Sequence, residues 1–297
     1  MSVTEGEIIG GCEIGRLLGS GGLGSVFKAL HRQSGRTVAL KVLAAHMAAK
    51  PGVVERFERE ARLCFQLDHP HLIAVHTWGE DDGRHYMAME YVAGSTLEAL
   101  SRRRDRLTWP MAASIVADVA SGLEHVHRLD IVHRDIKPAN MLVGRGGRAK
   151  LADLGLARDP QDGLGLARRL TTEGAAIGSP AYMAPEQIND TASVDAAADV
   201  YGLGASLYQG IVGRPPLIGD SPLDTCRRVL RDRPEPVANF HADVPEALSQ
   251  LIDACLDKQP ERRPASAVTV SEQLRALIGL AGYRPGTQLD VSGQPGP

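Results

Sequence analysis

The sequence predicts an α+β protein, in which a strand-rich first part precedes a mostly helical remainder. Three short runs of apolar and β-branched residues lie within residues 13–43 and are separated by glycine-containing turns. Apolar residues then recur at helical spacing in residues 53–67 and 110–129, and the chain after residue 186 predicts helices joined by loops. Because 43% of the 297 residues are hydrophobic, the chain can bury a sizeable core. Its length suggests about two domains.

Charge and hydropathy argue against two classes of partner. The net charge is −3, so the sequence predicts no basic surface for nucleic acid and no polybasic segment for an anionic membrane. The longest apolar helix candidate, residues 200–212, is interrupted by Ser206 and Gln209. Since it is shorter than the roughly 20 residues that cross a bilayer, we expect a buried core helix.

The cysteines and the start of the chain indicate the compartment. Cys12, Cys64, Cys226 and Cys255 lie far apart and form no CxxC pair, which argues against a zinc site and a disulfide framework. Residues 1–5 lack a basic segment followed by an apolar one, so we expect no secretory signal. A cytoplasmic protein is the resulting expectation.

A glycine-rich segment lies between the first two predicted strands. The three strands are expected at residues 13–18, 25–30 and 37–43. Residues 19–24 form a GxGxxG pattern, which by itself is weak evidence and fits a flexible hairpin tip. A dinucleotide fold requires a helix directly after the glycines, whereas a strand follows here. This order favours a glycine hairpin over ATP phosphates, because backbone N–H groups can approach oxygen closely where side chains are missing.

The helix predicted over residues 53–67 carries a charged residue near its apolar side. That side is expected to hold Phe57, Ala61, Cys64, Phe65 and Leu67. Glu60 lies near it, where a charge without a partner would be costly, and Lys41 on the third strand is the natural candidate. A glutamate on a helix more often faces solvent, so the residues alone leave both interpretations open.

The densest group of chemically active side chains lies in residues 133–140. This segment contains an imidazole, a guanidinium, a carboxylate, an ammonium and an amide between two short apolar runs, as expected of a catalytic loop between strands. Asp153 follows a further predicted strand. Asp135, Asn140 and Asp153 offer the hard oxygen ligands that Mg²⁺ takes together with phosphate oxygens. The residues therefore suggest phosphoryl transfer.

These residues resemble the catalytic and metal-binding loops of the protein kinase family, in its eukaryotic-like serine/threonine branch of bacterial type. The spacing agrees as well, with Asn140 five residues and Asp153 eighteen residues after Asp135. Residues 178–186 resemble the substrate-docking loop and the APE motif that closes it. The resemblance implies a two-lobed fold, with a small antiparallel β lobe carrying one main helix and a larger, mostly helical lobe.

The resemblance also implies the domain boundaries. The kinase domain is expected over residues 12–280, with the small lobe at 12–89, the hinge at 90–94 and the large lobe at 95–280. Residues 1–11 are expected to be a lead-in, and the Gly- and Pro-rich residues 281–297 a disordered tail.

The resemblance assigns roles to the charged residues of the catalytic loop. Asp135 is expected to accept or orient the proton of the substrate hydroxyl, and Lys137 to hold the transferring phosphoryl group. Lys137 also indicates specificity for serine and threonine. Asn140 and Asp153 are expected to hold Mg²⁺, although the same oxygen ligands suit Mn²⁺. We further expect Asp199 to brace the loop.

A second set of residues is expected to bind ATP. Lys41 would grip the α and β phosphates and would be locked by Glu60, because the Arg-Glu-Ala pattern before His69 resembles the family closely enough to favour that pair. Met89 is expected beside the adenine, and the backbone of residues 90–92 along its edge. The complete expected set is Leu18, Gly19, Ser20, Gly21, Gly22, Leu23, Gly24, Val26, Ala39, Lys41, Met89, Glu90, Val92 and Leu142.

Regulation and docking are expected in the segment after Asp153. An arginine directly before the catalytic aspartate, here Arg134, resembles the arrangement in kinases that are activated by phosphorylation of this segment. In those kinases the arginine pairs with the new phosphate. Thr171 and Thr172 are the candidate acceptors, with Glu173 supplying a constant charge. Ser179 is expected to dock substrate through its hydroxyl.

Two more features concern the large lobe and the metal-binding turn. The family suggests that Glu186 pairs with Arg263. Leu154 stands where the family usually has phenylalanine, and we expect activity to survive because leucine is also a bulky apolar side chain.

The sequence therefore predicts a protein kinase that uses ATP and Mg²⁺, acts on a protein substrate and phosphorylates its own activation loop, with a transient homodimer left open. A rival interpretation is a non-catalytic scaffold with a kinase fold. Such a protein would be expected to lack Lys41, Asp135, Asn140 or Asp153, and all four residues are present. A small-molecule kinase is a second rival. It would not be expected to carry residues 178–186 with both Glu60 and Arg263 in place.

Overall fold

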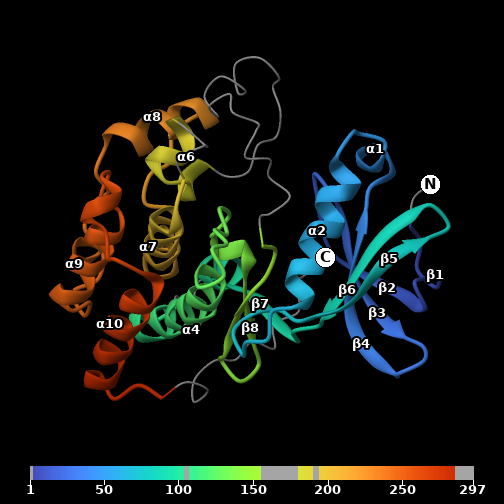
Figure 1. Ribbon diagram of the computed structural model, residues 1–297. Helices are drawn as coiled ribbons and strands as arrows, with labels where there is room; N and C mark the ends of the chain where they lie inside the picture. The colour runs from blue at the N-terminus through green and yellow to red at the C-terminus, as the bar shows by residue number, and fades with distance from the viewer. Residues whose placement is uncertain (1–2, 104–106, 155–179, 190–193, 285–297) are drawn as a thin grey trace. The chain divides into compact units, whose positions relative to one another are not determined.

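The computed structural model describes residues 3–103, 107–154, 180–189 and 194–284 (Figure 1). Their backbone separates into two compact units. The first contains the described residues up to Ala93 together with Leu154, and the second contains Gly94–Asp153 and the described residues from 180 onward. Most secondary structure of the first unit is strand and most of the second is helix.

A single antiparallel sheet forms the first unit, with the strand order β1-β2-β3-β4-β6-β5. Its strands are β1 Ile8–Ile9, β2 Cys12–Gly21, β3 Gly24–His31, β4 Arg36–Leu43, β5 Val75–Asp81 and β6 Arg84–Glu90. The turn between β5 and β6 has positive φ at both Asp82 and Gly83, the conformation that suits a two-residue hairpin. The buried side chains of β1 to β4 form one apolar cluster with Ala88 of β6, which includes Ile14, Phe27 and Leu40.

Two helices belong to the same unit, α1 Ala45–Ala48 and α2 Val53–Phe65. Helix α2 packs against β5 and buries Phe57, Ala61 and Cys64, as the helical spacing predicts. The expectation for Phe65 is wrong, because its side chain is 52% exposed. Phe65 follows Cys64 by one residue, so it is rotated about 100° away from the buried side. Its ring instead lies edge-on to Trp78, with the ring centroids 5.1 Å apart.

The second unit combines a small antiparallel sheet with a group of helices (Figure 1). The strands are β7 Gly94–Thr96, β8 Met141–Gly144 and β9 Ala149–Leu151. The helices are α3 Leu97–Ser101, α4 Trp109–His127, α6 Pro185–Asn189, α7 Ala196–Val212, α8 Pro222–Arg231, α9 Glu246–Cys255 and α10 Ala267–Leu280. Short 3₁₀ turns occur at η1 Pro138–Asn140, η3 Pro180–Tyr182, η5 Val237–Asn239 and η6 Pro260–Arg262.

Local signals in the sequence begin and end several of these helices. The side chains of Asp195, Ser221 and Ser266 accept hydrogen bonds from backbone N–H groups in the first turns of α7, α8 and α10. Each therefore satisfies one N–H group that has no partner within its helix. Helix α7 ends at Val212 and is followed by Gly213, whose φ of 85° is the left-handed conformation that glycine adopts without steric cost.

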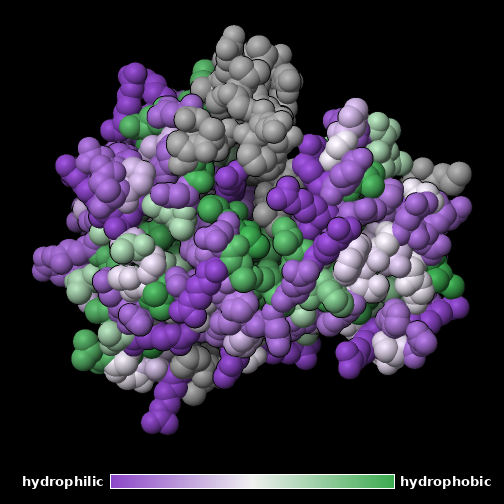
Figure 2. Space-filling model, in the orientation of Figure 1, coloured by the Kyte–Doolittle hydropathy of each residue, from purple (hydrophilic) through white to green (hydrophobic). Residues whose placement is uncertain are grey.

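Helices α4 and α7 form the core of the second unit. Helix α4 packs against α10 and α7, and Ile115, Val119 and Leu123 along it are fully buried. Helix α7 is buried along almost its whole length, which confirms the prediction of a core helix at residues 200–212. Among the described residues, no helix has both the length and the apolar character needed to cross a membrane. In Figure 2, the side of this unit that carries α8 and α9 is covered mainly by hydrophilic residues.

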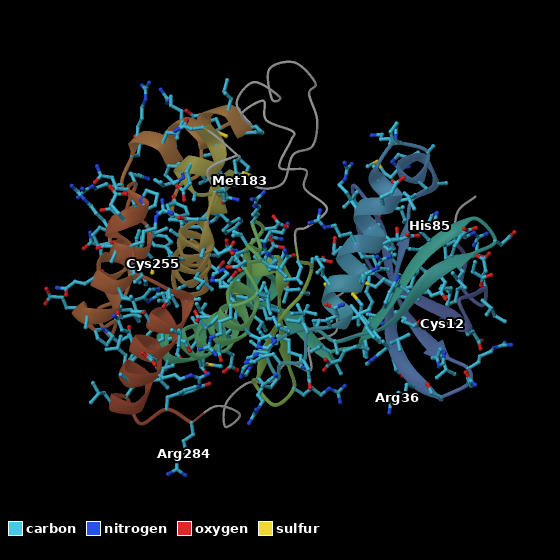
Figure 3. The ribbon with its side chains drawn as sticks, in the orientation of Figure 1. Cys12, Arg36, His85, Met183, Cys255 and Arg284 are labelled. Carbon is cyan, nitrogen blue, oxygen red and sulfur yellow. The ribbon has the colours of Figure 1, made fainter. Side chains whose placement is uncertain are left out.

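All four cysteines are free and buried. Figure 3 marks Cys12 in the sheet of the first unit and Cys255 in helix α9. The expectation that they form no disulfide is confirmed.

Candidate active site

The predicted catalytic loop connects helix α4 to strand β8 in the second unit. It contains Arg134 with a φ of 63°, and Asp153 after β9 has a φ of 52°. Positive φ is uncommon for residues other than glycine, since the side chain approaches the backbone closely in that conformation. Both residues therefore depend on surrounding contacts to hold them.

Asp199 of helix α7 supplies the contacts that hold the loop backbone. Its Oδ2 accepts a hydrogen bond from the N–H of His133 at 2.8 Å, and its Oδ1 accepts one from the N–H of Arg134, also at 2.8 Å. The Nε2 of His127 lies 2.8 Å from the same Oδ2. The carboxylate is buried and shared among these groups, which confirms the prediction that Asp199 braces the loop.

The carboxylate of Asp135 is held by two neighbouring side chains. Lys137 Nζ lies 2.7 Å from Asp135 Oδ2, so the two form an ion pair. Asn140 Nδ2 donates to the same oxygen at 3.1 Å and to the Asp135 carbonyl at 2.9 Å. The short 3₁₀ turn at Pro138–Asn140 returns the asparagine to the aspartate and makes this arrangement possible. The result is a carboxylate of fixed orientation, suited to receiving a proton from a substrate hydroxyl.

The same arrangement fits a divalent cation. Since the nitrogen of the Asn140 side chain is directed at Asp135, its oxygen is the atom that remains to bind a metal. Asp153, two residues after the end of strand β9, adds an exposed acidic residue. An amide oxygen and a carboxylate are hard ligands, and Mg²⁺ commonly completes such a set with phosphate oxygens and water.

His133 supports the loop from inside. Its side chain is fully buried, and its Nδ1 accepts a hydrogen bond from the N–H of Asp135 at 3.3 Å. Burial lowers the pKa of His133, despite the opposing effect of Asp199 and Asp135. The ring is therefore neutral at pH 7, which agrees with the predicted structural role.

In the first unit, strand β4 and helix α2 bring together the predicted lysine and glutamate. Lys41 Nζ lies 3.4 Å from Glu60 Oε1, and both side chains are largely buried. The predicted pair is therefore present. On paired strands, Val26 lies opposite Lys41, and Ala39 lies opposite Met89. Because alternate residues share one face of a sheet, these four predicted ATP-binding residues line the same face.

The glycine-rich segment is a hairpin, as its order before a strand predicts. Ser20 pairs with Ser25 and Gly21 with Gly24, so Gly22 and Leu23 form the tip. A Cβ atom on Gly24 would clash with the Val42 carbonyl oxygen, so packing excludes a side chain there. Among the described residues, Cβ atoms on Gly19, Gly21 and Gly22 would meet nothing within 4 Å. Internal packing does not require those three glycines, whereas the close approach of a phosphate would.

The predicted hinge begins at the end of strand β6. The N–H of Glu90 donates to the Ala74 carbonyl at 2.8 Å. An adenine contact at Glu90 would therefore involve its carbonyl oxygen. Of the other expected ATP-binding residues, Leu18 lies on β2 in the first unit and Leu142 on β8 in the second.

The predicted pair between Glu186 and Arg263 is bidentate. The two guanidinium nitrogens of Arg263 lie 2.6 and 2.8 Å from the two carboxylate oxygens of Glu186. Arg263 is buried and also donates to the carbonyl groups of Ala197 and Asp257. This pair therefore joins helix α6 to the start of α7 and to the segment after α9.

Two glutamines of the site were missed in the sequence. Gln187 Nε2 donates to the Arg134 carbonyl at 3.0 Å, and its Oε1 accepts from the N–H of Ala184 at 3.0 Å. Gln209 accepts a hydrogen bond from the hydroxyl of Tyr182 and donates to Ser101 Oγ. The only sequence signals are the position of Gln187 directly after Glu186 and the interruption of an apolar helix by Gln209.

Burial raises the pKa of Tyr182, so its hydroxyl keeps its proton at neutral pH and acts as the donor to Gln209. The adjacent Met183, labelled in Figure 3, is buried as well. The end of the predicted docking segment is therefore attached firmly to the second unit. Leu154 is also buried. Thr171, Thr172, Glu173 and Ser179 lie outside the described residues.

Residues 12–274 match the family model described as the protein kinase domain. The serine/threonine-protein kinase PknB of Mycolicibacterium smegmatis is 36% identical over 284 residues, which are 94% of this chain and 45% of the relative. PknH of Mycobacterium tuberculosis is 35% identical over 263 residues, 88% of this chain and 41% of PknH. The chain thus spans less than half the length of these curated relatives.

Comparison with solved structures also finds a protein kinase domain. The crystal structure of the Mycobacterium tuberculosis PknI kinase domain has a TM-score of 0.70 at 28% identity, and the match covers 93% of this chain and 99% of that domain. The antiparallel sheet with one main helix and the mostly helical second unit are the arrangement that the resemblance predicted. The chain belongs to the protein kinase family.

Proposed function

We propose that the chain is an ATP-dependent serine/threonine protein kinase, which transfers the γ-phosphoryl group to protein hydroxyls and phosphorylates its own activation loop. The observation that carries the proposal is the fixed carboxylate of Asp135, held at 2.7 Å by Lys137 and at 3.1 Å by Asn140. The backbone before Asp135 is held by Asp199, which accepts hydrogen bonds from the N–H groups of His133 and Arg134.

In the transfer, the substrate hydroxyl oxygen bonds to the γ-phosphorus while the bond from that phosphorus to the β–γ bridging oxygen breaks, which releases ADP. Asp135 orients the hydroxyl and receives its proton. Lys137, whose ammonium lies 2.7 Å from Asp135 Oδ2, would neutralise charge on the transferring group. Asn140 and Asp153 would hold Mg²⁺, which neutralises phosphate charge when bound. Mn²⁺ is compatible with the same ligands.

For ATP, the first unit would contribute Lys41, positioned by Glu60, and the bare backbone of Gly19, Gly21 and Gly22. The face that carries Val26, Ala39 and Met89 would contact the base, and the backbone of Glu90 and Val92 its edge. Leu18, Ser20, Leu23, Gly24 and Leu142 complete the proposed set.

For regulation, we propose that Thr171 or Thr172 accepts a phosphate, which then pairs with Arg134. Ser179 is proposed to dock the protein substrate, and a transient homodimer would permit phosphorylation in trans. We assign this activity to a kinase domain at residues 12–280. Four free cysteines support a reducing compartment such as the cytoplasm.

Phosphopeptide mass spectrometry tests the proposal. The purified chain is incubated with ATP and Mg²⁺ and with a generic basic protein substrate, alongside the Asp135→Asn variant. We expect phosphate on serine or threonine of the substrate, and on Thr171 or Thr172 of the chain, with the wild type alone. Equal melting temperatures and equal ATP binding would show that the variant is folded. Phosphate on neither protein, despite ATP binding, would contradict the proposal and favour a scaffold.

A further inference from the structure

The residue immediately before Asp135 has an unusual backbone conformation. Arg134 has a φ of 63°, in the left-handed region that residues with bulky side chains rarely adopt. Such a conformation persists where surrounding groups hold it, and it is often found at functional sites. Since Arg134 shares a peptide group with Asp135, whatever holds Arg134 also determines the direction in which Asp135 leaves the loop.

Two side chains hold Arg134, one on each side. Asp199 Oδ1 accepts from its N–H at 2.8 Å, and Gln187 Nε2 donates to its carbonyl at 3.0 Å. The carbonyl of Arg134 and the N–H of Asp135 belong to one planar peptide group. The opposite edge of that group donates to His133 Nδ1 at 3.3 Å. Gln187 and His133 therefore restrain the two edges of the peptide that carries Asp135.

Gln187 is itself anchored. Its Oε1 accepts from the N–H of Ala184 at 3.0 Å, and the preceding Glu186 is fixed by the buried Arg263. Gln187 also lines one small pocket together with Arg134, Asp135 and Met183. The side-chain amide thus joins the segment that ends the docking loop to the peptide of the catalytic aspartate.

We propose that Gln187 is a positioning residue for Asp135 and couples the docking segment to phosphoryl transfer. The proposal rests on the proposed kinase function. Both halves of the amide are used, because the oxygen accepts from Ala184 while the nitrogen donates to Arg134. A carboxylate at this position would retain the first hydrogen bond but could not make the second.

The Gln187→Glu variant separates these two hydrogen bonds. We expect kcat for a protein substrate to fall roughly ten- to a hundredfold, as for small misplacements of catalytic groups, with KM for ATP unchanged. Gln273→Glu is the matched control, because Gln273 lies on the exposed side of α10 and should tolerate the same chemical change. Unchanged kcat in Gln187→Glu would overturn the proposal.

The pH profile supplies a readout that general destabilisation would not produce. A protonated glutamic acid can donate to the Arg134 carbonyl, so the deficit of Gln187→Glu relative to wild type should shrink as the pH falls toward the carboxyl pKa of about 4.3. Arg134, Lys137, Asp135 and Asp199 line the same pocket, and Glu186 is adjacent. These groups are present in both proteins, so the ratio of the two rates isolates residue 187. A deficit that is constant with pH would contradict the proposal.

Hydrogen exchange of the catalytic-loop peptide, residues 131–143, tests the restraint without relying on activity. Faster exchange in Gln187→Glu than in wild type and Gln273→Glu is expected, and equal exchange would overturn the restraint. If the wild type bound ATP but transferred no phosphate, the proposed function would fail, while the exchange result would still decide whether Gln187 holds the loop.

Discussion

Gly202 of helix α7 lies directly against Ile136 of the catalytic loop. A Cβ atom on Gly202 would stand 2.7 Å from the Cβ of Ile136 and 2.9 Å from its carbonyl oxygen. Both distances are shorter than van der Waals contact, and Ile136 is buried. The missing side chain therefore lets the loop reach the helix whose Asp199 braces it.

Gly202→Ala should displace the loop and reduce activity. We expect a loss of about 1–3 kcal/mol in the free energy of unfolding, typical of overpacking, together with a clear fall in kcat. Urea unfolding and steady-state kinetics measure the two effects. Gly279→Ala in α10 is the control, because a Cβ atom there meets no described residue within 4 Å. Equal behaviour of the two variants would show that the close approach is unimportant.

The ion pair between Glu186 and Arg263 should contribute far more to stability than a surface pair. Glu186→Ala leaves the buried Arg263 without its carboxylate, and we expect unfolding to become easier by about 3–5 kcal/mol. Arg227→Ala, which breaks the more exposed pair with Asp224, should cost much less, because solvent screens that pair. Urea unfolding of both variants compares them directly. A similar cost for each would mean that burial does not strengthen the first pair.

Lys41 should contribute directly to ATP binding. Lys41→Met removes a cation proposed to contact phosphate, so we expect the dissociation constant for ATP to rise roughly tenfold, the weight of one charge-assisted contact. Isothermal titration calorimetry measures it. Lys50→Met serves as the control, since Lys50 is exposed. Should both variants bind ATP like the wild type, the assignment of Lys41 is wrong.

Lys258 should make stability depend on alkaline pH. Burial lowers the pKa of Lys258 to about 8, and its Nζ donates to the Val229 carbonyl in the last turn of α8. The ordinary lysine pKa is about 10.4, so between these values the unfolded chain binds more protons than the folded one. The Lys258 contribution to the free energy of unfolding should therefore rise with pH from about 8 to about 10.4 and stay constant below that window.

This prediction is checked by urea unfolding of wild type and Lys258→Met at pH 7, 8, 9 and 10. The variant removes the lysine titration, so its stability relative to wild type should fall across the window. Lys50→Met controls for the loss of an exposed lysine. A difference between wild type and Lys258→Met that does not vary with pH would refute the lowered pKa.

Much of the local structure could be predicted from the sequence. The three strands within residues 13–43, the glycine hairpin and helix α2 follow from residue periodicity and turn chemistry, which act between near neighbours. Phe65 is the one apolar residue of α2 that was wrongly predicted to be buried. It is the last residue of the helix and lies about 100° around the axis from the buried Cys64. The pairing of Lys41 with Glu60 was expected only because the family resemblance favoured it over a solvated glutamate.

The sequence by itself determined the family, the strand and helix pattern and the spacing of Asp135, Asn140 and Asp153. Tertiary structure alone decided which distant groups hold them. Gln187 meets the Arg134 carbonyl across 53 residues, and Gln209 meets Ser101 across 108. Neither glutamine belongs to a periodic pattern, since one hydrogen bond to a distant group leaves no trace in neighbouring residues. The role of Gly202 could not be predicted from the sequence either. A glycine is required there only because α7 and the catalytic loop pack closely against each other in the folded protein.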